Sequence, residues 1–347
     1  MYEPKYKISD VLLLEISELE QSKTKLDNAE FPAQTSKELL KKSKAVNMFH
    51  LAHMIGVDLT IKDAEKAVEG KKITTNDARG LILNNFRSAM EFVRSDVTRS
   101  QLEPDVNMLL HMNKILITEW KEVWEAKLRL DSNEVDSSMD GWVQIRDKSI
   151  TMFELESKLN EILFWFKTSQ GRVHNLIRIG VLFLELVRMA PFSHLNQITI
   201  IAIIDLLLYK YGYLTQTFLP IVRELDQHNQ ENIKIWQKCI EDQDSSNWLE
   251  RFILNLNAAV KEDKDKILGL VNTSKNTSKQ PFLDLNRRQL KILRYLQTIP
   301  TVKREDYVQM MDVSTMTAFR DLTDLVEKKL LRVEGRGRGT KYLLLNR

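Results

Sequence analysis

A short loop near the middle of the chain holds side chains that could do chemistry. Residues 190–196 read Ala-Pro-Phe-Ser-His-Leu-Asn, and His194 supplies an imidazole. An imidazole can take or give a proton near neutral pH. The loop leads into a helical pattern, and the first turn of a helix presents free N–H groups that bind anions. The loop is therefore a candidate site for an anionic ligand.

Two long apolar segments must position this loop. Residues 176–189 precede it and residues 198–208 follow it, and both are too apolar to form surface helices. We expect both to be core helices that hold the loop rigidly. The second segment carries Asp205 and reaches polar residues too soon to span a bilayer.

The composition is that of a globular protein with two or three domains. The chain has 347 residues, of which 43% are hydrophobic and 29% are charged. Its first residues lack the apolar core of a signal peptide, so we expect a cytoplasmic protein without membrane association. The single cysteine, Cys239, excludes an intrachain disulfide and a cysteine-rich metal site. We expect its thiol to lie in the core.

Charge is distributed unevenly along the chain. Residues 281–347 contain 14 Lys and Arg against 8 Asp and Glu, a net charge of +6 in a chain whose total is +3. Residues 1–280 therefore carry a net charge of −3. A basic segment attached to a mildly acidic body predicts that the C-terminal part meets a polyanion.

The loop and its flanks resemble the signature of the Fic family of AMP-transferring enzymes. The family pattern is H-P-F-x-D/E-G-N-G/K-R-x-x-R, and Pro191, Phe192 and Asn196 match it. The other defined positions depart from the pattern. They are Ala190 at the catalytic His, His194 at the acidic metal ligand, Leu195 and Gln197 at the glycine-type positions, and Ile198 and Ile201 at the two arginines.

The resemblance implies a Fic-type fold whose catalytic site is degenerate. Ala190 cannot accept a proton, no acid remains in the loop to hold Mg²⁺, and both arginine clamps are replaced. Leu195 and Gln197 resist the close backbone approach that glycine allows. We therefore expect no catalytic residue, no metal site and no ATP or Mg²⁺ cofactor. An altered enzyme that transfers another group with His194 or with a residue from outside the loop stays open as an alternative.

A second family element falls on residues 44–60. Many Fic proteins carry an inhibitory helix there with the pattern S/T-x-x-x-E-G/N, and the frame that fits places Leu51, Ile55 and Gly56 at its defined positions. In active relatives the Glu pairs with the second motif arginine, whereas this chain has Ile55 and Ile201. Losing one partner of a buried ion pair costs about 3–5 kcal/mol, but replacing both can be neutral. We therefore predict that Ile55 and Ile201 pack together; two unrelated core isoleucines are the alternative.

Residues 127–150 correspond to the flap with which active relatives clamp a target by β-pairing. Asp140-Gly141 is a turn signal, and residues 142–145 are predicted to form a strand. The family's proline-rich exit from the flap is absent, so we do not expect a substrate protein to dock here. The resemblance continues to about residue 260, with Trp248 and Phe252 as expected core aromatics.

The last part of the chain resembles a winged helix-turn-helix. Residues 287–297, 303–311 and 314–329 have helical patterns, and residues 330–334 and 340–345 alternate like strands around a glycine-rich turn. Ser314 should cap the third helix. The predicted inward side chains are Leu290, Leu293 and Leu296 on the first helix and Ala318, Leu322 and Leu325 on the third.

This second resemblance implies DNA binding. The start of the third helix would enter the major groove, the wing arginines would reach the backbone or the minor groove, and other basic residues would hold phosphates. The alternative is a winged helix that serves protein contacts only, and the basic charge favours DNA. The predicted DNA-binding residues are Lys303, Arg304, Thr315, Met316, Thr317, Arg320, Arg336, Arg338 and Lys341.

These observations predict a mainly α fold and a regulator. We expect a bacterial DNA-binding transcriptional regulator whose partners are DNA, a second copy in a homodimer, and a small-molecule or protein effector. The alternatives are a Fic-type enzyme with altered nucleotide or AMP transfer and a structural protein–protein module. The predicted domains are an N-terminal extension over 1–43, a Fic-like helical domain over 44–260 with its motif at 190–201, a linker over 261–285 and a winged helix over 286–347.

Overall fold

The chain divides into two compact units, Met1–Gly269 (unit 1) and Leu270–Arg347 (unit 2), and each is described by itself. It is mainly helical, as predicted. The computed structural model describes residues 2–27, 33–96, 104–130, 139–213, 221–277, 285–296, 301–328, 330–335 and 340–345.

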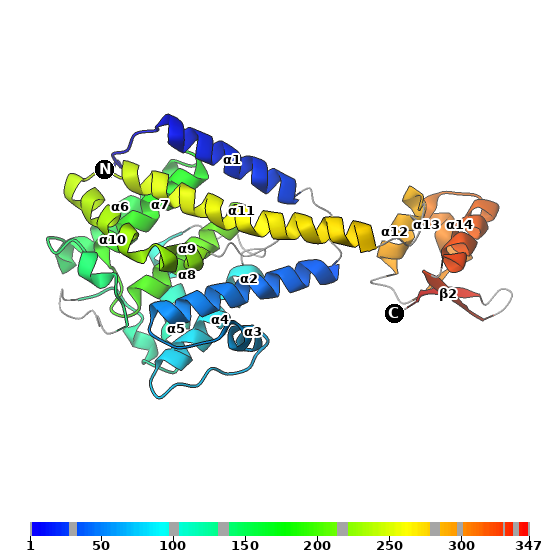
Figure 1. Cartoon of the computed structure of the whole chain (residues 1–347), viewed down its shortest axis with the longest axis horizontal. Helices are drawn as coiled ribbons and strands as arrows, with labels where there is room; N and C mark the ends of the chain where they lie inside the picture. The colour runs from blue at the N-terminus through cyan, green and yellow to red at the C-terminus, as the bar shows by residue number, and fades with distance from the viewer. Residues whose placement is uncertain are drawn as a thin grey trace. The chain divides into compact units, whose positions relative to one another are not determined.

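Unit 1 is built from helices joined by loops and two short 3₁₀ helices, η1 and η2 (Figure 1). In chain order they are α1 (Asp10–Asp27), α2 (Ala33–Met54), α3 (Ile61–Val68), α4 (Arg79–Asp96), α5 (Val106–Ile117), η1 (Val123–Glu125), η2 (Val143–Ile145), α6 (Met152–Thr168), α7 (Asn175–Met189), α8 (Asn196–Lys210), α9 (Ile221–Gln227), α10 (Asn229–Asp242) and α11 (Ser246–Thr277).

Helices α7 and α8 form the core of unit 1, which confirms the prediction for the two apolar segments. They pack against each other; α4 and α5 pack against α8, and α6 and α10 pack against α7. Every residue from 196 to 208 is buried. In the described ranges no helix is long and apolar enough to cross a membrane.

Gly180 allows α11 to approach α7 closely. A Cβ at this position would lie 2.7 Å from Cδ2 of Leu249 and 3.0 Å from Cδ1 of Phe252. The indole Nε1–H of Trp248 donates to the Gly180 carbonyl at 2.9 Å. Trp248 and Phe252 are fully buried, as the sequence predicted.

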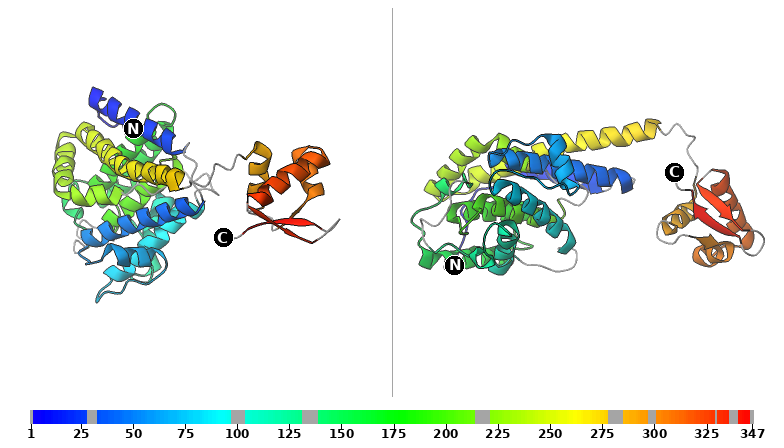
Figure 2. Two further views of the ribbon diagram at one scale, coloured as in Figure 1. Left: turned by 45° about the vertical axis from the view of Figure 1, so that its right-hand side comes forward. Right: turned by 90° about the horizontal axis from the view of Figure 1, so that it is seen from below.

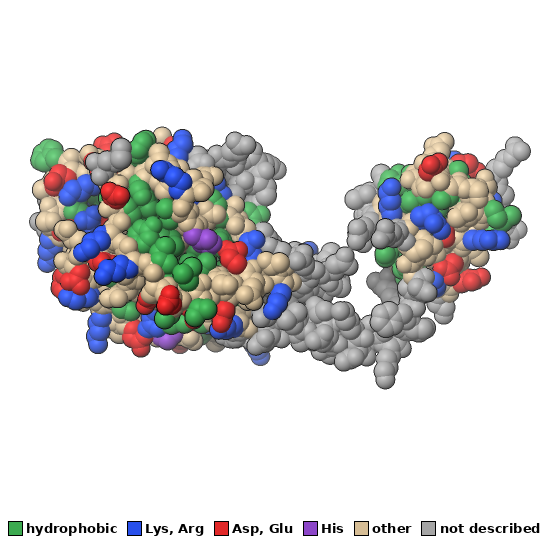
Figure 3. Space-filling view, turned by 90° about the horizontal axis from the view of Figure 1, so that it is seen from above, with side chains coloured by type: hydrophobic (Ala, Val, Ile, Leu, Met, Phe, Trp, Pro, Cys, Tyr) green, Lys and Arg blue, Asp and Glu red, His purple; other side chains and the backbone are tan. Residues whose placement is uncertain are grey.

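Helix α1 lies along the first half of α11 on the outside of unit 1 (Figures 1 and 2). The Asn257 amide of α11 donates to the Glu15 carbonyl of α1 at 2.7 Å. Leu19 of α1 is buried, whereas Val11 and Leu14 are more than half exposed. Hydrophobic side chains also gather in a patch on the face of unit 1 drawn in Figure 3.

Among its described residues, unit 2 contains the end of α11, three further helices and a three-stranded antiparallel sheet. The three helices and the sheet have the architecture of a winged helix. The strand order is β1-β3-β2, and Tyr342 of the central strand lies opposite Val302 on one side and Val333 on the other. The elements are α12 (Arg287–Tyr295), β1 (Val302–Lys303), α13 (Arg304–Met311), α14 (Thr315–Glu327), β2 (Leu331–Glu334) and β3 (Lys341–Leu344).

The core of unit 2 confirms most of the predicted inward positions. Leu296, directly after α12, is buried, and Leu293 of α12 is half-buried, whereas Leu290 is 45% exposed. The prediction for Leu290 is wrong, because the inward face of α12 follows Gln289, Ile292 and Leu296, which are three and four residues apart. The three inward positions predicted on α14 are fully buried: Ala318, Leu322 and Leu325.

Two other expectations differ from the structure. Residues 143–145 form the 3₁₀ helix η2 where we predicted a strand, because burial of Trp142 overrides the β propensity of the segment. Helix α11 continues to Thr277 through much of the range 261–285 that we predicted as a linker, and residues 261–270 contain good helix formers such as Lys and Leu.

Candidate functional site

The motif loop, defined here as residues 190–197, joins α7 to α8 and is almost entirely buried. Only the side chain of His194 has appreciable exposure, at 12%, and the other loop residues are buried. A loop that acts on a substrate has to be reachable by that substrate. The residues that cover the motif loop therefore decide whether a substrate can reach it.

The backbone of the loop turns sharply at two residues other than glycine. Ala190 has a φ of +40° and ends α7, and Leu195 has a φ of +55° and precedes α8. This left-handed region favours glycine because a Cβ is strained there. Leu195 stands at a glycine position of the Fic pattern, so the backbone keeps the conformation that glycine favours although the residue is leucine.

Asn196 closes the loop on itself. Its Nδ2 donates to the Phe192 carbonyl and its Oδ1 accepts from the Phe192 N–H, both at 2.8 Å. Both residues are buried, so this reciprocal pair satisfies polar groups that water cannot reach. The role of Asn196 in this chain is therefore structural.

Residues 127–129 cover one edge of the loop. They run antiparallel to residues 191–193, with Leu128 paired to Phe192 and backbone hydrogen bonds of 2.9 and 3.2 Å. The buried Arg129 side chain donates to the carbonyls of Ala190 at 3.1 Å and Met189 at 3.2 Å. A guanidinium at these carbonyls stabilises the C-terminal end of α7. The chain's own flap segment thus pairs with the loop, while residues 131–138 lie outside the described part.

Asp140 occupies the N-terminal end of α8. Its Oδ2 accepts the backbone N–H of Gln197 at 3.2 Å, and the Gln197 side chain accepts the Gly141 N–H at 3.2 Å. Burial raises the pKa of Asp140 to about 6, and backbone N–H groups of Gln197, Asn196 and Trp142 limit the rise. A carboxylate of the protein therefore stands where the helix start would attract an external anion.

Trp142 anchors Asp140 in this position. The Trp142 ring packs at centroid distances of 4.8 Å from Trp236 and 5.7 Å from Phe183. Its Nε1–H donates to Oδ1 of Asn229 at 3.2 Å. Asp140 precedes Trp142 by two residues in the chain. The buried Trp142 ring therefore leaves Asp140 little freedom to move away from the start of α8.

His194 is held by neighbours from outside the loop. Its Nε2 lies 3.1 Å from Oε2 of Glu125, and its ring lies edge-on to Trp120 at 5.5 Å. The Asn113 amide donates to the His194 carbonyl at 2.8 Å. Partial burial acts to raise the pKa of Glu125, but hydrogen bonds from Glu122 N–H and His194 outweigh it and lower that pKa. The imidazole is thus held by a hydrogen-bonding contact with Glu125.

The former arginine positions lie in the core. Ile198 and Ile201 on α8 are fully buried, and Leu51 and Ile55 at the end of α2 are buried in the same hydrophobic cluster. Gly56 follows with a φ of +73°. Direct contact between Ile55 and Ile201 stays a prediction.

One turn after Ile201, Asp205 is also buried. In the described part of the chain, neither of its carboxylate oxygens has a hydrogen-bond partner. Burial raises the pKa of Asp205 to about 8. Asp205 is therefore protonated at neutral pH. Among the residues that the structure describes, no group of His, Cys, Asp and Glu side chains could hold a metal ion.

In unit 2, the first residues of α14 are exposed, whereas the start of α8 in unit 1 is buried. Asp312, with a φ of +50°, ends α13, and Ser314 accepts the Thr317 N–H at 3.2 Å as the N-cap of α14. This confirms the predicted turn and cap. The first turn of α14 then leaves Thr315 and Met316 exposed, with Arg320 exposed one turn later.

The structure places seven of the nine predicted DNA-binding residues. Thr317 is half-buried, and its hydroxyl lies 3.0 Å from that of Ser314, so it belongs partly to the cap. Arg304 is half-buried, and Arg336 and Arg338 lie outside the described residues. The remaining predicted residues are exposed: Lys303, Thr315, Met316, Arg320 and Lys341.

The sheet brings two predicted phosphate-binding residues together. Lys303 on β1 lies opposite Lys341 on β3. Like charges directly opposite each other in a sheet are unfavourable, so an anion that binds both lysines would relieve repulsion. Glu334 lies on the other side of Lys341, and it forms an ion pair with Arg332 at 3.1 Å.

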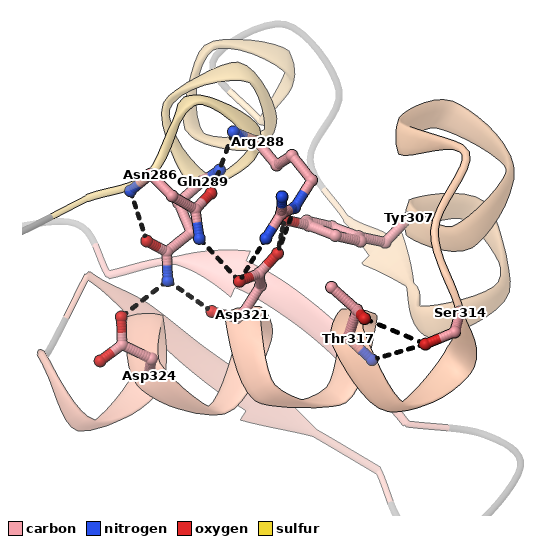
Figure 4. Close-up of polar contacts among 8 residues, drawn as sticks. All are labelled: Asn286, Arg288, Gln289, Tyr307, Ser314, Thr317, Asp321 and Asp324. Atoms are coloured by element: carbon pink, nitrogen blue, oxygen red, sulfur yellow. Dashed lines mark hydrogen bonds and ion pairs between the residues drawn. The ribbon is translucent and has the colours of Figure 1, made fainter.

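A buried polar network, which the sequence analysis missed, joins the three helices of unit 2 (Figure 4). Asp321 of α14 accepts from Arg288 Nε at 2.8 Å, Asn286 Nδ2 at 2.7 Å and the Tyr307 hydroxyl at 2.9 Å. Burial acts to raise the pKa of Asp321, but these donors outweigh it and hold that pKa below its usual value. The signal was available, because Asp321 follows Ala318 on the inward face of α14.

Phe319 is the second residue that the sequence analysis missed. It is 43% exposed on α14, three residues after Met316, which is 62% exposed. The guanidinium of Arg304 lies 5.0 Å from the centroid of the Phe319 ring. Its signal in the sequence was an apolar residue at an outward position of the third predicted helix of the C-terminal part.

Comparison with known proteins identifies the C-terminal part by sequence. Residues 288–339 match the DeoR-like helix-turn-helix domain. This match begins in α12, covers β1, α13, α14 and β2, and ends before β3. Comparison with curated protein sequences gives no match to the chain.

Comparison with solved structures identifies the fold. A Fic family protein from Desulfovibrio desulfuricans is similar over 100% of this chain and 99% of its own, with a TM-score of 0.59 and 15% identity. Fic-1 from C. elegans is similar over 76% of this chain and 72% of its own, with a TM-score of 0.57 and 14% identity. A Fic domain containing signaling protein from Bacteroides thetaiotaomicron is similar over 75% of this chain and 98% of its own, with a TM-score of 0.55 and 11% identity.

These likenesses confirm the fold that the motif predicted. The positions that differ from the Fic pattern are described above, and they are unaffected by the likeness. The chain combines the fold of Fic family proteins with a C-terminal DeoR-like helix-turn-helix domain.

Proposed function

We propose that this protein is a DNA-binding transcriptional regulator that contacts duplex DNA through unit 2. The observation that carries the proposal is the exposed start of α14, which presents Thr315, Met316 and Arg320 in a helix-turn-helix. Domains of this kind place such positions against base edges in the major groove. The DeoR-like match over residues 288–339 supports the same use.

The charge around α14 supports a nucleic acid as the partner. Lys303 and Lys341 face each other across the sheet, and Arg304 lies against Phe319 of α14. Residues 281–347 carry a net charge of +6. Basic side chains on the elements that flank a recognition helix bind phosphates and release counterions.

We infer that unit 1 does not transfer AMP. The buried motif loop and the Asp140 carboxylate at the start of α8 support this inference. The alternative enzyme has the contact between His194 and Glu125 in its favour. However, the His194 side chain is only 12% exposed. Position 190, where the family pattern has its catalytic His, is Ala190, which cannot act as a base. In our proposal unit 1 is a scaffold, a dimerisation unit or an effector sensor.

An electrophoretic shift with the gene's own promoter region, repeated at increasing salt, tests DNA binding. We expect a specific complex whose affinity falls as salt rises. Arg320→Ala should weaken it by about 10- to 100-fold, since a side chain that reads a base contributes about 1–3 kcal/mol. Leu290→Ala, an exposed position on α12, is the matched control and should leave affinity unchanged. Folded protein that gives no shift at low salt would refute the proposal.

Two measurements test the role of unit 1. Calorimetry with ATP and Mg²⁺ should give no binding heat, and tight binding would favour the altered enzyme while leaving the proposal for unit 2 in place. Sedimentation should give a dimer, because helix-turn-helix proteins often bind paired half-sites as dimers. A monomer at micromolar concentration would remove the homodimer from the proposal.

A further inference from the structure

The outward face of α14 is apolar at its centre. Met316 is 62% exposed and Phe319 is 43% exposed, although both are large hydrophobic residues. They are three residues apart and therefore lie on one face of the helix, with Thr315 and Arg320 beside them. The same helix buries Ala318, Leu322 and Leu325, so Met316 and Phe319 are not needed for the core of unit 2.

Basic side chains frame this apolar centre. The Arg304 guanidinium of α13 lies 5.0 Å from the Phe319 ring centroid, a cation–π contact that restricts both side chains. Residues 315–320 include no acid. The next residue, Asp321, points inward and binds Arg288. The exposed surface at the start of α14 is therefore both apolar and positively charged.

This combination fits one apolar group that duplex DNA displays. In the major groove, the C5-methyl of thymine is the hydrophobic feature of the base edges, and apolar side chains recognise it. Two such side chains one helical turn apart can reach methyl groups on neighbouring base pairs. A protein partner would also accept apolar side chains, but the basic frame and the absence of acids between residues 315 and 320 favour a polyanion.

We propose that Met316 and Phe319 contact thymine methyl groups in the major groove and thereby select thymine at defined positions of the operator. Thr315 and Arg320 supply hydrogen bonds to adjoining bases, and Arg304 fixes the Phe319 ring. This proposal rests on the proposed DNA binding of unit 2, and it names the sequence feature that this surface reads.

The experiment uses the full chain and a selection from random duplexes, followed by replacement of single thymines with uracil. Uracil pairs in the same way but lacks the C5-methyl group, so it removes only the apolar contact. We expect uracil at one or two positions of each half-site to weaken binding about 3- to 10-fold. Thymines elsewhere in the site should tolerate the replacement.

Variants assign the methyl contacts to the two side chains. Met316→Ala and Phe319→Ala should bind thymine and uracil duplexes with equal affinity at the sensitive positions. Leu290→Ala, at an exposed apolar position of α12, should keep the full difference. Because Met316 and Phe319 are exposed, both variants should keep the wild-type melting temperature, which differential scanning fluorimetry checks.

Each other outcome overturns a defined part of the argument. If no duplex is selected, both DNA binding and thymine reading are wrong. If a duplex is bound but uracil is tolerated at every position, DNA binding stands and thymine reading is wrong. If Met316→Ala or Phe319→Ala changes the oligomeric state and keeps the thymine preference, the surface contacts protein and the proposal is wrong.

Discussion

The starts of α8 and α14 are both exits from a tight turn, and they treat their polar groups in opposite ways. At α8 the chain supplies its own anion, Asp140, and buries the loop around it. At α14 a single serine, Ser314, caps the helix, and the following side chains are exposed. A binding surface has to leave groups for its partner, so we assign binding to α14 and support to the motif loop.

The motif loop also separates two kinds of position. Pro191, Phe192 and Asn196 match the Fic pattern, and all three are buried; Asn196 and Phe192 close the loop. The departed positions are those where the pattern has a proton acceptor, a metal ligand, glycines or arginines. Ile198 and Ile201, at the arginine positions, are fully buried. What this chain keeps is what the loop needs in order to fold.

The largest effect is expected at Asp321, because its side chain joins the helices of unit 2 and so supports the exposed start of α14. Asp321→Ala leaves the Arg288, Asn286 and Tyr307 donors without their acceptor and should destabilise unit 2 by about 3–5 kcal/mol. DNA binding should then be lost with it. Thermal unfolding of the full chain, with Asp324→Ala as the milder control, measures this. A DNA-binding variant of unchanged stability would contradict the role of the network.

Asp205 of unit 1 differs from Asp140 in that it is buried without hydrogen bonds to either carboxylate oxygen from the described residues. With its pKa raised to about 8, the folded state holds a proton that the unfolded state releases above its ordinary pKa, so stability should fall as pH rises from about 4 to 8. Asp205→Asn should remove this slope and stabilise unit 1 by about 2–4 kcal/mol at pH 8. Melting temperatures across this pH range check it; identical slopes would contradict the assignment.

Asp140 tests whether the start of α8 is filled by an anion of the protein. Asp140→Ala should destabilise unit 1 by about 1–3 kcal/mol, because it leaves the Gln197 N–H unpaired. Formate, a small carboxylate, should restore part of the melting temperature, whereas chloride at equal ionic strength should not. Asp205→Ala is the control and should show no rescue. Equal effects of formate on both variants would rule out a specific anion site.

The smallest effect is expected at Lys341. Lys341→Ala should weaken DNA binding about 3- to 5-fold for every sequence and lower the salt slope by about 1, since it removes one phosphate contact. Lys291→Ala, an exposed lysine of α12, removes the same charge and should leave the slope unchanged. A loss at Lys341 that depends on sequence would mean that this residue reads bases.

Much of the fold was predictable because its signals are local. The apolar runs on both sides of the loop predicted α7 and α8, and the spacing of Ala318, Leu322 and Leu325 predicted the inward face of α14. The prediction for residues 142–145 failed because Trp142 is fixed by Phe183 and Trp236, which are distant in sequence. Local propensity does not include such contacts.

The site was less predictable than the fold. Types and spacing predicted the loss of catalytic groups from the motif loop and the exposed start of α14. They could not predict that Asp140 caps α8, because Asp140 and Gln197 are 57 residues apart and meet only in the folded chain. Met316 was among the predicted residues. Phe319 was missed although its outward position on α14 was a signal, and only its contact with Arg304 needed the folded structure.

The left-handed backbone at Leu195 has a consequence for anyone who would rebuild a phosphate pocket in this fold. The main chain already follows the path that a glycine would take, so reinstating one there asks for no new bend. The obstacles are the volume of the leucine side chain itself and the Asp140 carboxylate, which already binds the start of α8. Restoring a phosphate site in this fold would therefore begin with the replacement of these side chains by smaller, uncharged ones.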